Sequence, residues 1–534
     1  MLPRIIRLPD VSEANSRHCF VFLEDMLMFY AARFFVGYDL LEARAFRITR
    51  DADLYIDEED AQDLVVEVER QLKKRQRGQA VRLEFEVGTS RFMRRFMTQE
   101  MNLEKEDMYQ IDGPLDMTVF FGFCGIKGYN HLRYPEAHPH SPWSMLELKR
   151  TPETNIFDMI REKDLLIHLP YESFDESVVN FLYSAANDKD VLAIKQTLYR
   201  VSSSSPVVQA LEKAVQNGKQ VTVLMEVKAR FDEANNILMA RRLEKAGAHV
   251  IYGLVGLKTH SKCTLVIRRE KDGIRRYVHV ATGNYNASTA KLYTDLGILT
   301  CNDRFGIDAS AFFNLLSGYS DPPIWDSFIV APINLRQRCI ELIDREIHFA
   351  KNGEDAHMIA KMNSLLDKGI IEKLYEASQA GVKIELIVRG ICVLIPGIPG
   401  ASDNITVRSI VGRFLEHSRI FWFRNGGREE LYISSADWMP RNLNDRVELM
   451  VPIEDPEIKR RLKQMVDIEL SDNQKAHIMQ ADGTWLKTIS AENQLCAQEY
   501  FQKIAEKRDA EDEMTLAQKL EPYTPVLGHG DGSD

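Results

Sequence analysis

Two stretches of the chain share one pattern of apolar and polar positions. Residues 210–227, ALEKAVQNGKQVTVLMEV, and residues 373–390, KLYEASQAGVKIELIVRG, each begin as an amphipathic helix, turn at a glycine (Gly218 and Gly381) and continue as an apolar strand. Apolar residues three and four apart predict a helix, and a short apolar run predicts a buried strand. Helix, turn and strand in this order indicate βαβ-type units with a parallel sheet. The chain therefore contains an internal duplication.

The first 145 residues have a different pattern. Helical spacing predicts a helix over about 61–75, and alternation in VRLEFEV predicts a strand over 81–87. The proline- and histidine-rich segment YPEAHPHSPW at 134–143 breaks regular structure and indicates a linker. We therefore expect an α+β head domain followed by two α/β domains and a polar, disordered tail, with bounds of 1–145, 146–327, 328–504 and 505–534.

Each copy of the duplication continues to a histidine that is followed two residues later by a cation. The first copy has His260 and Lys262 in THSKCTLVI, and the second has His417 and Arg419 in EHSRIFWF. Side chains two apart on a strand point to the same face, so each pair is expected to project together. A neutral imidazole is a good nucleophile for phosphorus near neutral pH, and a neighbouring cation stabilises charge on phosphate oxygens. A lone histidine is usually a hydrogen-bonded core residue, but duplication with a matched cation favours a phosphoryl-transfer site in one cleft between the two halves.

Composition and charge narrow the class of protein. Sixty-eight Lys and Arg against 79 Asp and Glu give a net charge of -11, which argues against general nucleic-acid binding but permits a local basic pocket. No apolar run reaches the roughly 18 residues of a membrane helix. The seven cysteines include no CxxC pair, which argues against a zinc site and a disulfide framework. We expect a cytoplasmic protein in which Cys263, beside the predicted site, is a packing residue.

Two classes of enzyme use paired H-x-K halves. The phospholipase D family carries an aspartate in H-x-K-x-x-x-x-D, and here Ile267 and Arg424 occupy that position in the two copies. Neither side chain is an acid. This favours phosphoryl transfer, and a phospholipase D-like phosphodiesterase remains the alternative.

Several segments resemble the polyphosphate kinase family. No single segment is specific, but seven occur in order across both halves. They are AIKQTLYR (193–200), EVKARFDEANN (226–236), GLKTHSK (256–262), TGNYN with YTDLGILT (282–300), RGICVLIPGIPG (389–400), SIVGRFLEHSRI (409–420) and SSADWMPRNL (434–443). FRITRDADL (46–54) and IDGPLDM (111–117) extend the likeness into the first domain.

The resemblance implies a fold and an activity. The fold would be two phospholipase D-like α/β domains forming a duplicated catalytic core, preceded by an α+β head domain. The activity would be that of a polyphosphate kinase, which transfers the terminal phosphate of ATP reversibly to inorganic polyphosphate through a phosphohistidine, with Mg²⁺ as cofactor and no nucleic-acid partner. Family likeness also implies a homodimer or homotetramer peripheral to the inner membrane face. Because family members begin with a helical domain that supplies an asparagine to the nucleotide site, we expect a truncated chain, a shortened gene product or a divergent member. An inactive fragment that binds polyphosphate or assembles with other subunits is a second alternative.

The resemblance also assigns roles by position. His260 matches the phosphorylated histidine, and His417 matches a second histidine that contacts the nucleotide phosphates and serves as acid or base. Tyr293 and Arg389 match nucleotide-binding positions. 

Arg200 and Arg230 match positions associated with the magnesium ion. A guanidinium has no lone pair for a metal, so we interpret both as phosphate clamps beside an ion held by phosphate oxygens and water.

Other residues have weaker claims. Lys262 and Arg419 are assigned to catalysis, and Asp295 and Arg446 to nucleotide binding, because a basic lining suits a polyanionic substrate. A structural ion pair is an equal alternative for each. His279, next to ATGNYN, is expected to be a core or supporting residue and not a catalyst.

Overall fold

The computed structural model describes residues 3–9, 18–52, 64–75, 78–143, 145–146, 154–318 and 324–519, with side chains up to residue 508. The chain divides into two compact units, Met1–Glu136 and Ala137–Asp534. Among the residues in these ranges, no helix is long and apolar enough to cross a bilayer.

The first unit is an α+β unit. Its three-stranded sheet consists of β3 (Phe46–Arg50), β4 (Ala80–Glu86) and β5 (Met108–Ile111), with β4 antiparallel to β3 and parallel to β5. The other elements are β1 (Ile5–Arg7), β2 (Phe20–Phe22), α1 (Leu23–Phe29), α2 (Leu64–Arg75) and α3 (Arg91–Met101). The strand predicted over 81–87 lies within β4 apart from its last residue. The helix predicted over 61–75 is α2, and residues 61–63 lie outside the described ranges.

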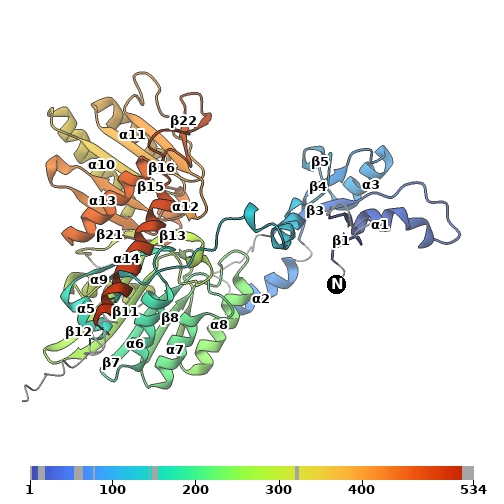
Figure 1. The fold of residues 1–534 in the computed structure, drawn as a ribbon. Helices are drawn as coiled ribbons and strands as arrows, with labels where there is room; N and C mark the ends of the chain where they lie inside the picture. The colour runs from blue at the N-terminus through green and yellow to red at the C-terminus, as the bar shows by residue number, and fades with distance from the viewer. Residues whose placement is uncertain are drawn as a thin grey trace, which may run out of the picture. The chain divides into compact units, whose positions relative to one another are not determined.

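The second unit contains two copies of one α/β fold, each built on a large mixed sheet (Figure 1). The first half comprises α5 (Ile156–Glu162), β6 (Leu165–Leu169), α6 (Asn180–Asn187), β7 (Val191–Leu198), α7 (Pro206–Gln216), β8 (Gln220–Met225), α8 (Glu233–Ala246), β9 (His249–Tyr252), β11 (Cys263–Glu270), β12 (Gly273–Ala281), β13 (Tyr293–Thr300) and α9 (Asp303–Leu316). The second half comprises β14 (Ile329–Ala331), α10 (Leu335–Lys351), β15 (His357–Met362), α11 (Lys368–Ala380), β16 (Lys383–Val388), β17 (Ile405–Ile410), β19 (Ile420–Phe423), β20 (Glu430–Ser434), α12 (Pro440–Asn444), β21 (Arg446–Pro452), α13 (Pro456–Leu470), β22 (Ala476–Met479) and β23 (Trp485–Lys487). An α+β unit followed by a duplicated α/β core confirms the predicted fold class.

Strand order repeats between the halves. The first sheet runs β13-β12-β11-β7-β8-β9 and the second runs β21-β20-β19-β15-β16-β17 before β22 and β23. Strands β7 to β9 and β15 to β17 are parallel, as the helix-turn-strand pattern predicts. The parallel sheet that the pattern predicts does not extend to β11 to β13 and β19 to β21, which are antiparallel. Strands joined by short turns, as β11 and β12 are, can only pair antiparallel.

The two halves exchange short strands. Strand β10 (Lys258–Thr259) of the first half pairs in parallel with β21 of the second, and β18 (Leu415–Glu416) of the second half pairs in parallel with β13 of the first. After each exchanged strand the chain crosses back to its own sheet through three residues, 260–262 in one half and 417–419 in the other. The prediction that the histidine motifs lie on strands is therefore wrong, because each motif forms the link between two sheets and cannot continue a ladder in either.

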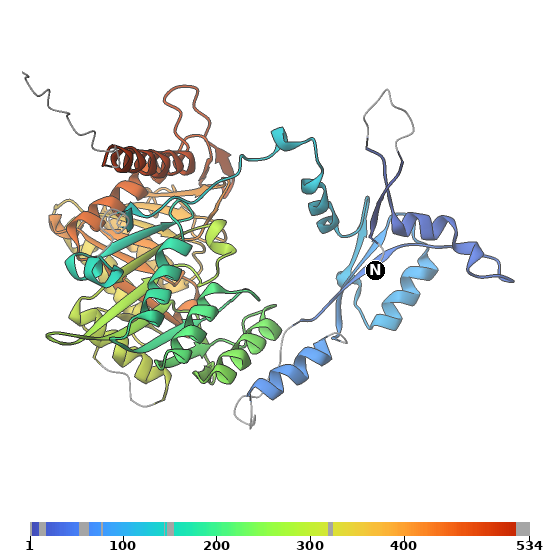
Figure 2. The same ribbon diagram turned by 60° about the horizontal axis from the view of Figure 1, so that its bottom comes forward.

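Helix α14 (Ala497–Lys519) lies across both halves (Figure 1 and Figure 2). The Gln498 side chain donates to Phe414 O and Glu416 in the second half, and the Phe501 ring contacts Tyr171 in the first. The tail predicted to begin at residue 505 starts inside this helix, whose continuation is rich in Ala, Glu and Lys, all good helix formers. Residues 520–534 of that predicted tail lie outside the described ranges.

Candidate active site

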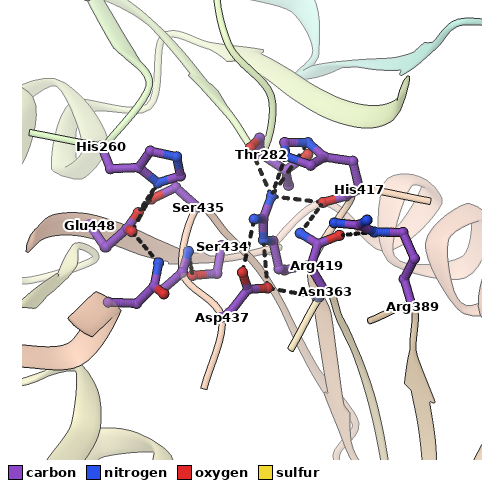
Figure 3. Close-up of polar contacts among 12 residues, drawn as sticks. His260, Thr282, Asn363, Arg389, His417, Arg419, Ser434, Ser435, Asp437 and Glu448 are labelled. Atoms are coloured by element: carbon purple, nitrogen blue, oxygen red, sulfur yellow. Dashed lines mark hydrogen bonds and ion pairs between the residues drawn. The ribbon is translucent and has the colours of Figure 1, made fainter. Parts of the chain in front are cut away.

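His260 is oriented by a carboxylate from the opposite half. Its Nδ1 lies 2.9 Å from each carboxylate oxygen of Glu448, which is fully buried on β21 (Figure 3). Glu448 also accepts hydrogen bonds from the Asn442 amide at 2.6 Å and the Ser435 hydroxyl at 2.5 Å. A carboxylate surrounded by donors acts as the acceptor, so Nδ1 of His260 carries the proton and Nε2 keeps its lone pair.

His417 has the mirror arrangement. Its Nδ1 lies 2.8 Å and 2.9 Å from the two carboxylate oxygens of Asp295, on β13 of the first half. The Thr282 hydroxyl donates to the same carboxylate at 2.6 Å. Each exchanged strand therefore brings its histidine to a carboxylate on the strand with which it pairs.

The surroundings keep both imidazoles neutral at pH 7. Burial lowers the pKa of His260 well below its ordinary value, and the positive charges of Lys262 and Arg446 lower it further. Burial also lowers the pKa of His417, against the opposing effect of Asp295. Burial alone would raise the pKa of Asp295, but the facing His417 and its hydrogen bonds lower it. A neutral imidazole whose Nδ1 is occupied can use Nε2 as a nucleophile or base.

The cation of each motif donates a hydrogen bond to the backbone of its own histidine. The Lys262 ammonium donates to the carbonyl oxygen of His260, and Nη1 of Arg419 donates to the carbonyl oxygen of His417 at 2.7 Å. Arg419 also forms an ion pair with Asp437 at 3.2 Å (Figure 3). Nη1 of Arg419 lies 3.4 Å from Thr282 O, which joins the second histidine's group to the first half.

Three further predicted residues lie around these pairs. The Tyr293 ring centroid is 5.1 Å from that of His417. Nε of Arg389 donates to Asn363 at 2.9 Å, and the Asn363 amide donates to the carbonyl oxygen of His417 at 3.3 Å. Arg446 begins β21 beside Lys258, where its charge acts on His260.

Arg200 and Arg230 are adjacent to each other but are separated from His260 by Tyr199. Arg200 forms an ion pair with Asp232 at 3.0 Å and donates to Arg230 O at 3.2 Å. The Tyr199 ring lies 5.5 Å from the Arg200 guanidinium carbon and 4.7 Å from the His260 ring. 

The magnesium ion that the resemblance implies has no set of protein ligands here. Within the described ranges, no group of three or more His, Cys, Asp or Glu side chains could hold a metal ion. Guanidinium groups are not metal ligands, so Arg200 and Arg230 do not fit a protein-held magnesium site.

His279 and Cys263 belong to the core, as the sequence predicts. His279 is 2% exposed, its Nδ1 lies 2.9 Å from the Tyr285 hydroxyl, and burial lowers its pKa to about 3. Cys263 is fully buried, which raises the pKa of its thiol.

Sequence reasoning missed Glu448, Asp437 and Asn363. The duplication could have identified Glu448. TDLGILT and RVELMVP are equivalent strands of the two copies, and Asp295 and Glu448 occupy equivalent positions in them. The Asp295–His417 contact itself depends on the strand exchange, which the sequence pattern does not reveal.

Two neutral imidazoles, each fixed by a carboxylate and accompanied by a cation, define a site for chemistry at phosphorus. Family models match three parts of the chain: the polyphosphate kinase middle domain at residues 1–123 and polyphosphate kinase C-terminal domains 1 and 2 at residues 155–322 and 328–498.

Known proteins agree with these matches. The chain is 52% identical over 479 residues to the polyphosphate kinase of Halalkalibacterium halodurans, covering 89% of this chain and 67% of the relative. It is 49% identical over 496 residues to the polyphosphate kinase of Bacillus anthracis, covering 92% and 69%. It is also similar to the crystal structure of polyphosphate kinase from Porphyromonas gingivalis, with a TM-score of 0.82, 32% identity, and coverage of 96% of this chain and 74% of that one. The chain belongs to the polyphosphate kinase family.

Proposed function

We propose that this protein transfers the terminal phosphate of ATP reversibly to polyphosphate through a phosphohistidine at His260. The observation that carries the proposal is the contact of His260 Nδ1 with Glu448. This contact leaves Nε2 as a free, neutral nucleophile beside a buried cation, Lys262.

The reaction has two displacements. In the first, the Nε2 lone pair of His260 forms a bond to the γ-phosphorus of ATP, and the bond from that phosphorus to the bridging oxygen breaks with its electron pair leaving on ADP. In the second, a terminal oxygen of polyphosphate attacks the same phosphorus, and the N–P electron pair returns to Nε2. Both steps run in reverse when ADP accepts the group. Glu448 keeps the Nδ1 proton in place and stabilises the positive charge that the ring acquires while phosphorylated.

We assign nucleotide binding to the surroundings of His417. The Tyr293 ring lies beside the imidazole, and Arg389 is tethered through Nε, which leaves its terminal nitrogens for phosphate oxygens. His417, with Nδ1 on Asp295, has Nε2 available to contact the nucleotide phosphates or to exchange a proton.

Lys262 and Arg446 offset the charge of the phosphates, whereas Arg419 is paired with Asp437 and holds the backbone of His417. Phosphoryl transfer needs mainly positioning and electrostatic stabilisation of the equatorial oxygens, and cations in a buried site act more strongly than in water. When ATP is bound, Mg²⁺ would supply charge neutralisation on the phosphate oxygens, which are its natural ligands.

Labelling with γ-³²P ATP tests the proposal. The protein should acquire label that is stable in base and labile in acid, and the label should map to a peptide containing His260. His260→Gln should abolish it, whereas His348→Ala, at an exposed position on α10, should not change it. Equal labelling of His260→Gln would refute the mechanism.

Two assays separate the alternatives. Cleavage of a phosphodiester in the absence of ATP, without labelling, would favour a phosphodiesterase. Binding of polyphosphate without release of ADP would favour an inactive binding protein.

A further inference from the structure

The loops that follow β12 and β20 form equivalent hydrogen bonds in the two halves. The Thr282 N–H donates to Leu296 O and the Ser435 N–H donates to Leu449 O, each at 2.9 Å. The Leu296 N–H donates to the Thr282 hydroxyl and the Leu449 N–H to the Ser435 hydroxyl, each at 3.0 Å. Thr282 and Ser435 are therefore equivalent positions.

Counting two residues on from Thr282 and Ser435 gives a second equivalent pair, Asn284 and Asp437. The sequences TGN and SAD thus differ by one formal charge at this equivalent position.

In the second half this position neutralises the cation. Asp437 contacts Nε and Nη2 of Arg419 at 3.2 Å each, and the Asn363 N–H donates to the same carboxylate at 2.7 Å. Burial alone would raise the pKa of Asp437, but the charge and hydrogen bonds of Arg419 lower it. Arg419 and Asp437 are therefore a buried ion pair with no net charge.

In the first half the cation has no such partner. Lys262 is 2% exposed, and within the described ranges it forms no ion pair. Its ammonium donates to His260 O and lies 5.7 Å from the Tyr199 ring centroid. The side-chain oxygen of Asn284 is buried and accepts no hydrogen bond from the residues described. 

A buried cation with no carboxylate in contact is unfavourable, and burial lowers the pKa of Lys262 to about 7 against the opposing charge of Glu448. An incoming phosphate supplies the missing negative charge.

We propose that the difference between Asn284 and Asp437 selects which of the two equivalent histidines receives the phosphoryl group. The inference rests on the proposed phosphohistidine mechanism. At His260 the anionic phosphoryl group meets a lysine that has no carboxylate in ion-pair contact among the residues described. At His417 the arginine is already neutralised, and the Asp437 carboxylate disfavours a second anion close by.

Exchange of the two side chains tests the inference. The full chain and its variants are labelled briefly with γ-³²P ATP, digested at high pH, and the phosphohistidine peptides are quantified by mass spectrometry. Asn284→Asp places a carboxylate at the position that Asp437 has in the second half, and it should lower the initial rate of His260 labelling by about ten-fold or more, the size of a lost charge-assisted hydrogen bond. The double variant Asn284→Asp with Asp437→Asn should carry label on His417.

Asn286→Asp is the matched control. It places the same charge in the same loop, and its side chain can keep accepting from the Ser288 and Thr289 N–H groups at 3.0 and 3.1 Å, losing only the long donation of the Asn286 amide to Arg200 O at 3.5 Å. Labelling of this variant should stay within about two-fold of the parent protein. Thermal melting of each variant reports its folding, and Asp437→Asn alone gives a second reading, because it should raise the share of label on His417.

The outcomes separate the two proposals. If the parent protein carries label on His260 and Asn284→Asp, although folded, is labelled as fast as the control, the inference is overturned while the mechanism stands. The same holds if Asp437→Asn and the double variant carry no label on His417. If the parent protein carries no phosphohistidine, the proposed function itself fails.

Discussion

His260 and Glu448 are in contact although 188 residues separate them along the chain, with Nδ1 2.9 Å from both carboxylate oxygens. The pairing of β10 with β21 produces this contact, because it carries the histidine across to the opposite sheet. The equivalent contact of His417 with Asp295 arises from β18 and β13 in the same way. Each histidine of the proposed mechanism is therefore positioned by the other half of the protein.

Glu448→Gln should lower the rate of His260 phosphorylation by roughly 100-fold, the scale of a lost proton-transfer or tautomer-fixing group. A glutamine amide can donate to Nδ1, which places the ring proton on Nε2 and removes the attacking lone pair. Rapid-quench labelling with ATP measures the rate. Glu354→Gln, at an exposed position after α10, is the control and should behave as the parent protein. An undiminished rate in folded Glu448→Gln would contradict this role.

Arg389→Lys should raise the KM for ATP by about ten-fold while changing kcat less, because a lysine cannot bond to Asn363 and present a second nitrogen to phosphate at once. Steady-state kinetics with polyphosphate held constant measures both parameters. Arg338→Lys, on the surface of α10, is the comparison. An unchanged KM in Arg389→Lys would remove that residue from the nucleotide site.

The pH dependence of kcat/KM should reflect the ionisation of the Lys262 side chain. Burial lowers the pKa of its ammonium to about 7, against the opposing charge of Glu448. The side chain is charged below that pH and neutral above it, so kcat/KM, which reflects the free enzyme, should fall as pH rises through about 7. The pKa of His260 is lowered well below its ordinary value, so the imidazole stays neutral near pH 6.5. The profile of kcat/KM should therefore show no acidic limb there from His260.

Lys262→Arg should move the alkaline limb to higher pH, since a guanidinium remains charged and the equivalent position of the second half is the arginine Arg419. If the limb is the same in Lys262→Arg and the parent protein, another group is responsible for it.

Stability should depend on a buried charge cluster behind the second histidine. Lys361 on β15 contacts Glu416 at 2.6 Å and also Glu469 on α13, and all three side chains are almost fully buried. Lys361→Met leaves two carboxylates without a cation, which should cost about 3–5 kcal/mol of unfolding free energy. The triple variant Lys361→Met, Glu416→Gln, Glu469→Gln should recover part of the loss, because it leaves no buried charge unpaired. Urea midpoints measure both effects, and a triple variant no more stable than Lys361→Met would contradict the electrostatic origin.

Much of the fold follows from local pattern. The helix, glycine turn and strand of the two repeats form as α7 with β8 and α11 with β16, because spacing of apolar residues and glycine at a left-handed turn act over a few residues. The same reading identified His260, Lys262, His417 and Arg419. It placed them on strands, where the structure has links between sheets.

The sequence alone determined the duplicated α/β class, the family, and the two histidine–cation motifs, since each depends on residue types and spacings close together in the chain. Tertiary structure decided which carboxylate faces which imidazole and which cation is neutralised. Those contacts join residues such as His260 with Glu448 and Arg419 with Thr282, which lie on different halves and meet only when the sheets exchange strands. A pairing between sheets depends on the packing of the whole core, so the periodicity of one segment cannot predict it.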